Sequence, residues 1–280
     1  MTKLSIITIN RNDSEGLRRT IQSVITQTSK DFEFVIVDGA STDNSMQTLF
    51  DCLQVPETNQ TTHGKINVNG LHVLWISEPD TGIYNAMNKG IRMSSGEYGL
   101  MLNSADSLHD ERVVEHILPL LHTDDIIQGN VQIEKNGIMQ IVRGYGKTDI
   151  TFFEALNAQF LHQASFIRKD LYDRYGYYLE DYRKNSDTYF YITSLALGNA
   201  TFRYEDVTVA LFDMNGISNN EAWNKIDKEE DQRFYREHLS PRIMEVWRNG
   251  QKKIAFYDTL HKHSLSWKLA VLLKVIANKF

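Results

Sequence analysis

The run Asn103-Ser104-Ala105-Asp106 puts an amide and a carboxylate directly after a hydrophobic, strand-like stretch at residues 98–102. Open α/β sheets bind ligands at the carboxyl ends of their strands. An acidic side chain at such a position can hold a divalent cation against a phosphate. Asn, Ser and Asp are also common turn residues, so the run by itself leaves an ordinary turn as the alternative.

Three other strand-like stretches in the first half of the chain are also followed by polar groups. Residues 4–9 are followed by Asn10, Arg11 and Asn12, residues 32–37 by Asp38, and residues 71–76 by Glu78 and Asp80. Parallel strands bring their carboxyl ends to one sheet edge, so these groups together favour a nucleotide site over unrelated turns. Neither G-x-G-x-x-G nor G-x-x-x-x-G-K-[ST] occurs. This absence disfavours a phosphate held by a glycine-rich loop and favours a cation held by carboxylates.

Apolar periodicity predicts the elements that must position these groups. The strands at 4–9, 32–37, 71–76 and 98–102 alternate with three helical segments, which predicts a parallel sheet covered by helices. Residues 55–70 are polar and are predicted to be a loop. Farther on, the patterns predict a helix at 113–121, strands at 126–127 and 130–142 with a turn at 135–137, mixed short elements at 151–218, and helix at 221–250.

Composition limits the class of protein. The chain has 280 residues, of which 41% are hydrophobic, so it is expected to be globular, and its net charge of −6 argues against a general nucleic-acid binder. The single cysteine, Cys52, excludes an intrachain disulfide. There is no apolar run of the ~20 residues that a membrane span needs, and the N-terminus lacks a signal-peptide pattern. These features predict a cytoplasmic protein.

Seven segments, in this order, resemble family 2 glycosyltransferases with the glycosyltransferase-A fold, particularly the bacterial exopolysaccharide and colanic-acid-type subgroup. They are LSIITINRND (4–13), VIVDGASTDNS (35–45), SEPDTGIYNAMNKGI (77–91), SGEYGLMLNSADSL (95–108), HQASFIRKDLY (162–172), LEDYRKNSDTYF (179–190) and GIS (216–218). The resemblance implies an α/β, Rossmann-like glycosyltransferase-A fold with a mixed, mostly parallel central sheet. We expect a catalytic domain at 1–218, with a nucleotide-sugar-binding half at 1–108 and an acceptor-binding half at 109–218. A helical extension with a basic amphipathic tail is expected at 219–280.

The resemblance also implies a nucleotide-sugar donor, linked to UDP or GDP. The residues that match donor-contacting positions are Thr8, Asn10, Arg11, Asp38, Asp80, Asn85, Asn88, Lys89, Asn103 and Ser104. Within this set, Asp38 would hydrogen-bond the nucleobase and Lys89 would supply the counter-charge to the diphosphate. A solvated helix lysine is the alternative for Lys89.

A divalent metal, Mn²⁺ or Mg²⁺, is the implied cofactor. The family motif is usually Asp-x-Asp, whereas here Asn103-Ser104-Ala105 occupies the motif and Asp106 is its one carboxylate. One carboxylate can still hold a cation together with donor phosphate oxygens and water. We therefore predict Asp106 as the metal ligand, with Asn103 in support, and joint binding of metal and nucleotide.

An inverting transferase needs a base to take the proton of the acceptor hydroxyl. The subgroup signature aligns Asp187 with that base, and a helix N-terminus would favour its ionised form. Its alternative role is a helix N-cap. Asp181, in the pair Glu180-Asp181, is the competing candidate, with a surface charge as its own alternative.

Histidine residues raise two further questions. His162 and Gln163 match a family position that faces the acceptor or diphosphate, although a structural role for His162 is equally compatible with the sequence. The remaining candidates for a metal site lack ligand spacing, so no zinc site is expected; they are His63, His72, His109 and His122.

The last twenty residues, 261–280, carry lysines and apolar side chains but no Asp or Glu. Residues 267–280 are too short to span a bilayer but could lie in its interface as a basic helix, which would suit a lipid-linked acceptor. A terminal helix packed on the body or on another subunit is the alternative.

The sequence therefore predicts an inverting glycosyltransferase that builds a surface polysaccharide on a saccharide or lipid-linked saccharide acceptor. We expect it in the cytoplasm or peripherally on the inner face of the membrane, as a monomer or homo-oligomer, with no nucleic-acid partner. The alternatives are a non-catalytic nucleotide-sugar-binding protein and a nucleotidyltransferase.

Overall fold

The computed structural model describes residues 2–122, 124–135, 137–148, 150–156, 158, 160–213 and 224–262. The chain divides into two compact units, Met1–Glu230 and Asp231–Phe280. The predicted boundary between residues 218 and 219 falls in 214–223, outside the described residues, as does the GIS segment.

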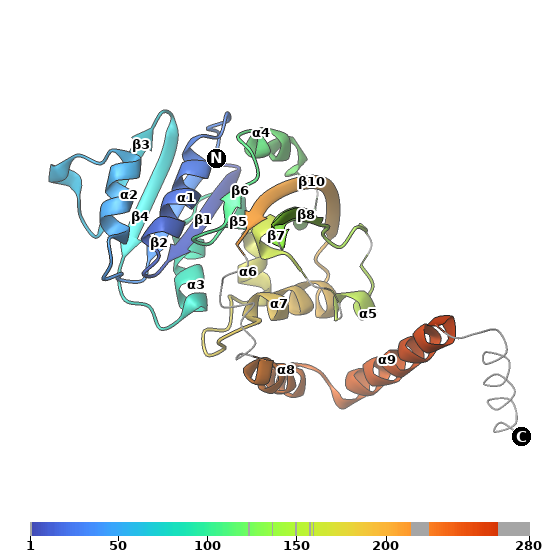
Figure 1. The fold of residues 1–280 in the computed structure, drawn as a ribbon. Coiled ribbons are helices and arrows are strands. Elements are labelled where there is room, and N and C mark those ends of the chain that lie inside the picture. Colours follow the sequence, from blue (N-terminus) through green and yellow to red (C-terminus); the bar gives the residue numbers. More distant parts are fainter. Residues whose placement is uncertain are drawn as a thin grey trace, which may run out of the picture. The chain divides into compact units, whose positions relative to one another are not determined.

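A parallel core carries the strand ends that the sequence singled out (Figure 1). Its strands lie in the order β4-β2-β1-β5, with bounds β1 Leu4–Asn10, β2 Glu33–Asp38, β4 Leu71–Ser77 and β5 Tyr98–Met101. The sequences of β1 and β2 are almost continuously apolar because these strands are buried over their whole lengths.

Further strands extend this core into a mixed sheet with the order β3-β4-β2-β1-β5-β9-β7-β10-β6, in which β10 pairs parallel with β7 and the other added pairings, including that of β8 with β7, are antiparallel. The added strands are β3 His63–Val68, β6 Ser107–Leu108, β7 Ile126–Lys135, β8 Ile138–Val142, β9 Ser165–Arg168 and β10 Phe202–Phe212. The predicted mixed α/β fold with a mostly parallel centre is confirmed.

The prediction of a loop at residues 55–70 is wrong. The segment contains a short helix, η1 (Glu57–Asn59), and β3, which pairs antiparallel with β4 at the sheet edge. An edge strand exposes every second side chain, and here His63, Lys65 and Asn67 are the exposed ones. Their polarity hid the alternation with the half-buried Ile66 and Val68.

Helices cover both faces of the sheet (Figure 1). Alternate residues of β2 face opposite sides: Phe34 and Ile36 pack in the cluster with α1 and α2, whereas Val35 and Val37 pack in the cluster with α3, α6 and α7. The helices of this unit are α1 Ser14–Ile25, α2 Ser45–Leu53, α3 Ile83–Met93, α4 Val113–Ile117, α5 Phe152–Ala155, α6 Asp170–Tyr175 and α7 Ser186–Tyr191. Short helical turns follow at η2 Leu118–Leu120, η3 His162–Ala164 and η4 Ile192–Leu197.

Two longer helices follow the gap at 214–223, namely α8 (Asn224–His238) and α9 (Pro241–Lys262). Tyr235 and Trp247 join them by a ring contact with centroids 5.4 Å apart. Across the described residues, every helix is too short or too polar to cross a bilayer. The predicted basic tail at 267–280 lies outside the described residues.

Candidate active site

The carboxyl ends of β1, β2 and β4 meet, as the strand pattern predicted, because Asn10 lies beside Asp38 and Asp38 beside Ser77 in the parallel register. The fully buried Asp38 carboxylate accepts hydrogen bonds from Asn10 Nδ2 (2.8 Å), Ser41 N (2.9 Å), Ser41 Oγ (2.6 Å) and Ser77 Oγ (2.6 Å). These bonds use the usual acceptor capacity of a carboxylate. Asp38 therefore ties the strand ends together.

Above these strand ends lies a pocket of about 580 Å³, a volume in the range that small-molecule ligands occupy. Of the predicted site residues, those that line it are Asn10, Arg11, Asp80, Asn103, Ser104, Asp106, His162 and Gln163. Thr8 is fully buried and donates to Leu102 O at 2.7 Å, so it holds β1 against the end of β5.

Arg11 and Asp80 form one wall of the pocket. The Arg11 Nη1 atom lies 3.3 Å from Asp80 Oδ1; the arginine side chain is 62% exposed and the aspartate only 6%. Asp80 also accepts from Gly82 N at 3.1 Å and sits where a side chain at Gly39 would collide with its carboxylate. The Asp80 carboxylate is thereby held in place, while the Arg11 guanidinium is exposed to solvent.

Asp106 lies at the base of the pocket, almost completely buried. Burial raises its pKa from 3.8 to about 7, although the nearby His162 and a hydrogen bond from Asp213 N (3.0 Å) act in the opposite direction. The charge of Asp213 raises this pKa further. Burial destabilises the ionised form of this carboxyl, and a positive charge placed beside it would stabilise that form.

Asn103 and Ser104 complete the base of the pocket. Ser104 Oγ donates to Asn10 Oδ1 at 2.8 Å, which couples the ends of β1 and β5. Asn103 Oδ1 is buried and has no hydrogen-bond partner among the described residues. A buried acceptor without a partner is costly, so a ligand atom that contacted this oxygen would relieve that cost.

His162 joins the pocket to Asp187. Its Nδ1 lies 3.1 Å from Asp187 Oδ2, its Nε2 lies 3.4 Å from Asn103 Nδ2, and Tyr84 Oη donates to Asp187 Oδ1 at 3.2 Å. Burial opposes charge on both groups, but their mutual attraction and hydrogen bonds prevail. The pKa of Asp187 is lowered, and that of His162 is raised with help from Asp106. His162 lines the pocket, whereas Asp187 stands behind it.

The competing candidate, Asp181, is exposed and is not among the described residues that line the pocket. Its neighbour Glu180 instead accepts from Asn85 Nδ2 (2.7 Å) and Asn88 Nδ2 (2.8 Å) on α3. Lys89 donates to Pro79 O at 2.7 Å and pairs with Glu78 at 2.8 Å. The predicted donor residues of α3 thus contact protein segments that flank the site.

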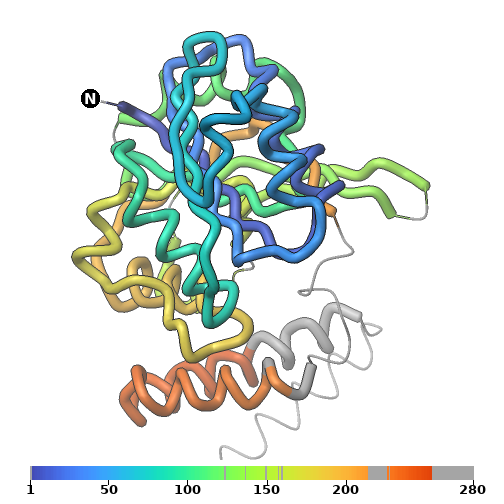
Figure 2. The backbone as a smooth tube through the Cα atoms, turned by 90° about the vertical axis from the view of Figure 1, so that its left-hand side faces the viewer, coloured from blue at the N-terminus to red at the C-terminus, as the bar shows by residue number. Residues whose placement is uncertain are grey.

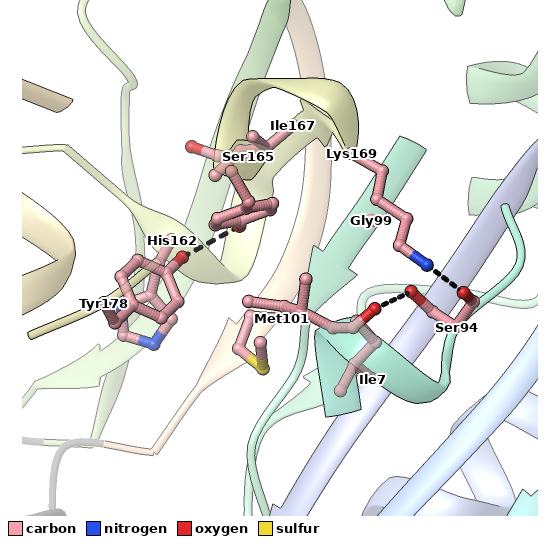
Figure 3. A pocket seen from close by; sticks show the side chains of 11 residues that line it. Ile7, Ser94, Gly99, Met101, His162, Ser165, Ile167, Lys169 and Tyr178 are labelled. Carbon is pink, nitrogen blue, oxygen red and sulfur yellow. Dashed lines mark hydrogen bonds between the residues drawn. The ribbon is translucent and has the colours of Figure 1, made fainter. Parts of the chain in front are cut away.

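A second cavity of about 10 Å³ adjoins His162, with His162 and Tyr178 on one side and Ser94 and Lys169 on the other (Figure 3). It has room for about one water molecule. The ligand site is therefore the larger pocket.

Acidic and histidine side chains do not form a metal-ligand cluster of three or more within the described part of the chain. Asn103, Asp106 and Asp213 are among the residues with side-chain oxygen atoms that line the pocket. Any bound cation would therefore need further oxygen ligands from its nucleotide or from water.

Comparison with known proteins identifies the family. Residues 5–200 match the sequence profile of Glycosyl transferase family 2. The chain is a family 2 glycosyltransferase. This glycosyltransferase is 28% identical over 219 residues to a PGL/p-HBAD biosynthesis glycosyltransferase of Mycobacterium bovis, covering 77% of this chain and 78% of the relative. It is 29% identical over 224 residues to an uncharacterized glycosyltransferase of Mycobacterium tuberculosis, covering 78% and 77%.

Solved structures share the fold of this glycosyltransferase. S. aureus TarS in complex with UDP-GlcNAc matches with a TM-score of 0.56 at 19% identity, over 75% of this chain and 58% of TarS 1-349. The mannosyltransferase PcManGT from Pyrobaculum calidifontis, in complex with GDP-Man and Mn²⁺, matches with a TM-score of 0.60 at 13% identity, over 99% and 81%. The predicted family and enzyme class are confirmed, and the enzyme transfers a sugar from a nucleotide-sugar.

Sequence reasoning missed Arg19 and Asp213, which also line the pocket and pair at 3.1 Å. Asp213 directly follows β10, and β10 pairs with β6 so that Leu211 lies opposite Ser107. The strand-end argument applied beyond residue 108 would have found Asp213. Arg19 lies within α1 and not at the end of a strand, so the strand-end argument could not have found it.

Proposed function

We propose that this glycosyltransferase moves a sugar, with inversion, from a UDP- or GDP-linked donor to a saccharide acceptor. The observation that carries the proposal is the pocket at the strand ends, where Asn103, Asp106 and Arg11 converge and His162 lines the wall in front of Asp187. One compartment therefore holds groups suited to a diphosphate and a group suited to accepting a proton.

The reaction needs a proton acceptor when the acceptor hydroxyl attacks the anomeric carbon. The new bond joins that oxygen to the anomeric carbon, the bond to the phosphate oxygen breaks, and the nucleoside diphosphate departs with the electron pair. We assign the proton to the His162–Asp187 pair. With Nδ1–H donating to Asp187, the lone pair lies on Nε2, where it accepts from Asn103 Nδ2 at 3.4 Å and can instead take the proton of an acceptor hydroxyl.

A divalent cation fits the base of the pocket. The unpartnered oxygen of Asn103 and the buried carboxyl of Asp106 are the groups that would hold it, with Asp213 adjacent. When bound, Mn²⁺ or Mg²⁺ supplies positive charge to the diphosphate and to the departing nucleotide. Mn²⁺ in the PcManGT complex supports this assignment.

The donor class follows from the relatives and the pocket. TarS binds UDP-GlcNAc and PcManGT binds GDP-Man. Arg11 lines the pocket with a side chain that is 62% exposed and is suited to the phosphates, whereas Lys89 pairs with Glu78. Asp38 and Thr8 would act on the donor through the position of Asn10 and the strand ends.

For the acceptor we propose a lipid-linked saccharide of a surface polysaccharide. The mycobacterial relative is named for PGL/p-HBAD biosynthesis. The basic, apolar sequence at 267–280 is suited to an anionic membrane surface.

The test is release of nucleoside diphosphate from a panel of UDP- and GDP-sugars with Mn²⁺. Asp187→Asn should reduce turnover by about 10²–10⁴-fold, the usual contribution of a general base, and leave donor binding intact. Asp181→Asn is the matched control and should retain activity. Full turnover in Asp187→Asn, or release of pyrophosphate instead of nucleoside diphosphate, would contradict the proposal.

A further inference from the structure

The β7–β8 hairpin projects from the sheet as a two-stranded arm, light green in Figure 2. Its second strand, β8, exposes Ile138 (62%), Met139 (50%) and Ile141 (57%). Elsewhere in the described residues, the exposed large hydrophobic side chains are Leu197 (39%) and Val246 (61%), which are distant from each other in the sequence. Successive strand residues point to opposite faces, so Ile138 lies on one face of the arm and Met139 and Ile141 lie on the other. Exposed apolar side chains grouped on one short strand mark an interaction site.

The backbone of β8 is also open. Residues 138–142 pair with β7 on one side, and no other strand in the described residues pairs with the second side. Exposed strand edges are usually protected by charged residues or proline. The sequence of β8, Ile-Met-Gln-Ile-Val, contains neither.

The β7–β8 arm does not contribute to the candidate active site. No residue of β7 or β8 lines the 580 Å³ pocket within the described chain. An explanation for its apolar surface must therefore come from a partner other than the donor.

We propose that β8 pairs antiparallel with β8 of a second copy of this chain, about a two-fold axis through Gln140. In this register Ile138 lies opposite Val142, and Met139 lies opposite Ile141. Gln140 lies opposite its own copy as a neutral pair. Every apolar side chain of the strand thus meets another, no like charges face each other, and the interface is closed by symmetry.

A membrane fits this arm less well. A lipid surface would cover the three apolar side chains but would leave the open edge of β8 without hydrogen-bond partners. The hairpin also carries both signs of charge, at Glu134 and Lys135, and the whole chain has a net charge of −6. A second strand would bury the apolar side chains and would also form hydrogen bonds with the open backbone edge of β8.

The test uses the full chain and sedimentation velocity over a concentration series. Wild type should show a concentration-dependent dimer. Gln140→Lys and Gln140→Glu each put like charges opposite one another on the axis, so each alone should weaken dimerisation about tenfold or more. An equimolar mixture of the two variants should restore it, because the charges then attract. Gln140→Thr is the neutral control and should dimerise like wild type.

Because residue 140 is exposed, circular dichroism should show all three variants folded. A wild-type chain that stays monomeric throughout the series would overturn the proposal, as would single variants that dimerise normally. Binding of a monomeric wild type to phospholipid vesicles that Ile141→Asp abolishes would assign the arm to a membrane instead and would also overturn it, because binding through residues 267–280 would not respond to that change. None of these outcomes depends on sugar transfer.

Discussion

His162 lies between Asp187 and the pocket, so the proton acceptor that we propose consists of both side chains. The imidazole presents Nε2 to the pocket while Nδ1 is held by the carboxylate. Asp187 alone would be ionised from mildly acidic pH upward, because its pKa is lowered. A neutral His162, whose pKa is raised above 6.5, is available only at higher pH.

We therefore expect kcat to rise with pH through an apparent pKa above 6.5, the ordinary value for histidine. His162→Gln should lower kcat by about 10²-fold or more and abolish this step in the pH–rate profile. The measurement is single-turnover sugar transfer from pH 5 to 9. A wild-type rate that stays constant across this range would show that Asp187 acts without the imidazole.

The raised pKa of Asp106 makes the free energy of unfolding depend on pH. Below pH 3.8 its carboxyl is protonated in both the folded and unfolded states, whereas between 3.8 and about 7 only the folded state keeps the proton. The free energy of unfolding therefore falls as pH rises through this window, and the full cost is present above pH 7.

Asp106→Asn should then stabilise the metal-free protein at pH 8 by about 2–4 kcal/mol and have little effect near pH 4. The measurement is urea unfolding in the presence of a chelator. The asparagine can still accept the hydrogen bond from Asp213 N, so packing is preserved. Equal effects at the two pH values would contradict the raised pKa.

At the scale of elements, α3 holds the segment that leads to α7. Asn88 donates to Tyr178 O and Glu180 Oε1 at 2.8 Å and accepts from Tyr178 N at 3.1 Å, while Tyr84 of the same helix reaches Asp187. The sequence predicted Asn88 as a donor contact. In the structure its amide is used by the backbone of Tyr178 and the carboxylate of Glu180, in the segment that precedes Asp187.

Asn88→Ala should lower the free energy of unfolding by about 2–4 kcal/mol, because it leaves buried backbone groups of Tyr178 without partners. The loss should appear without any donor present, in chemical denaturation. Asn85→Ala, which removes the more exposed bond to Glu180, is the control and should cost less. Equal stability of Asn88→Ala and wild type would indicate that the side chain serves the donor instead.

The sequence predicted a strand correctly where both faces of that strand are buried. The strands β1 and β2 are continuous apolar runs, and a polar group follows each, so both the strands and their ends were predictable. The edge strand β3 was missed because half of its side chains face solvent. The role of Asn88 was missed because its partners Tyr178 and Glu180 are distant in sequence, and no local pattern encodes such a contact.

At the scale of the whole molecule, metal and donor should stabilise the enzyme together. We expect UDP- or GDP-sugar with Mn²⁺ to raise the midpoint of thermal unfolding, with about 2.7 kcal/mol at a donor concentration of 100 Kd. A chelator should remove most of this shift, because a cation at the proposed site of Asp106 and Asn103 would need oxygen ligands from the nucleotide to complete its coordination shell. An undiminished shift in chelator would exclude joint binding.

The proposed membrane contact makes a separate prediction about the C-terminal sequence. Deleting residues 262–280 should shift the protein from the membrane fraction to the soluble fraction of a cell lysate. Lys268→Gln with Lys274→Gln should shift it partly, since each lysine near an anionic surface contributes about 1 kcal/mol. An unchanged distribution for both variants would count against the tail as an anchor.

The buried Asp38 has a thermodynamic consequence for ligand capture. Its four internal hydrogen bonds, and that of Ser104 to Asn10, order the base of the pocket before any donor arrives. Few protein torsions besides those of Arg11 then need to be frozen on binding, so the conformational-entropy cost on the protein side is small. Calorimetry should accordingly show a less unfavourable binding entropy for wild type than for Asp38→Ala, in which these strand ends lose their common acceptor.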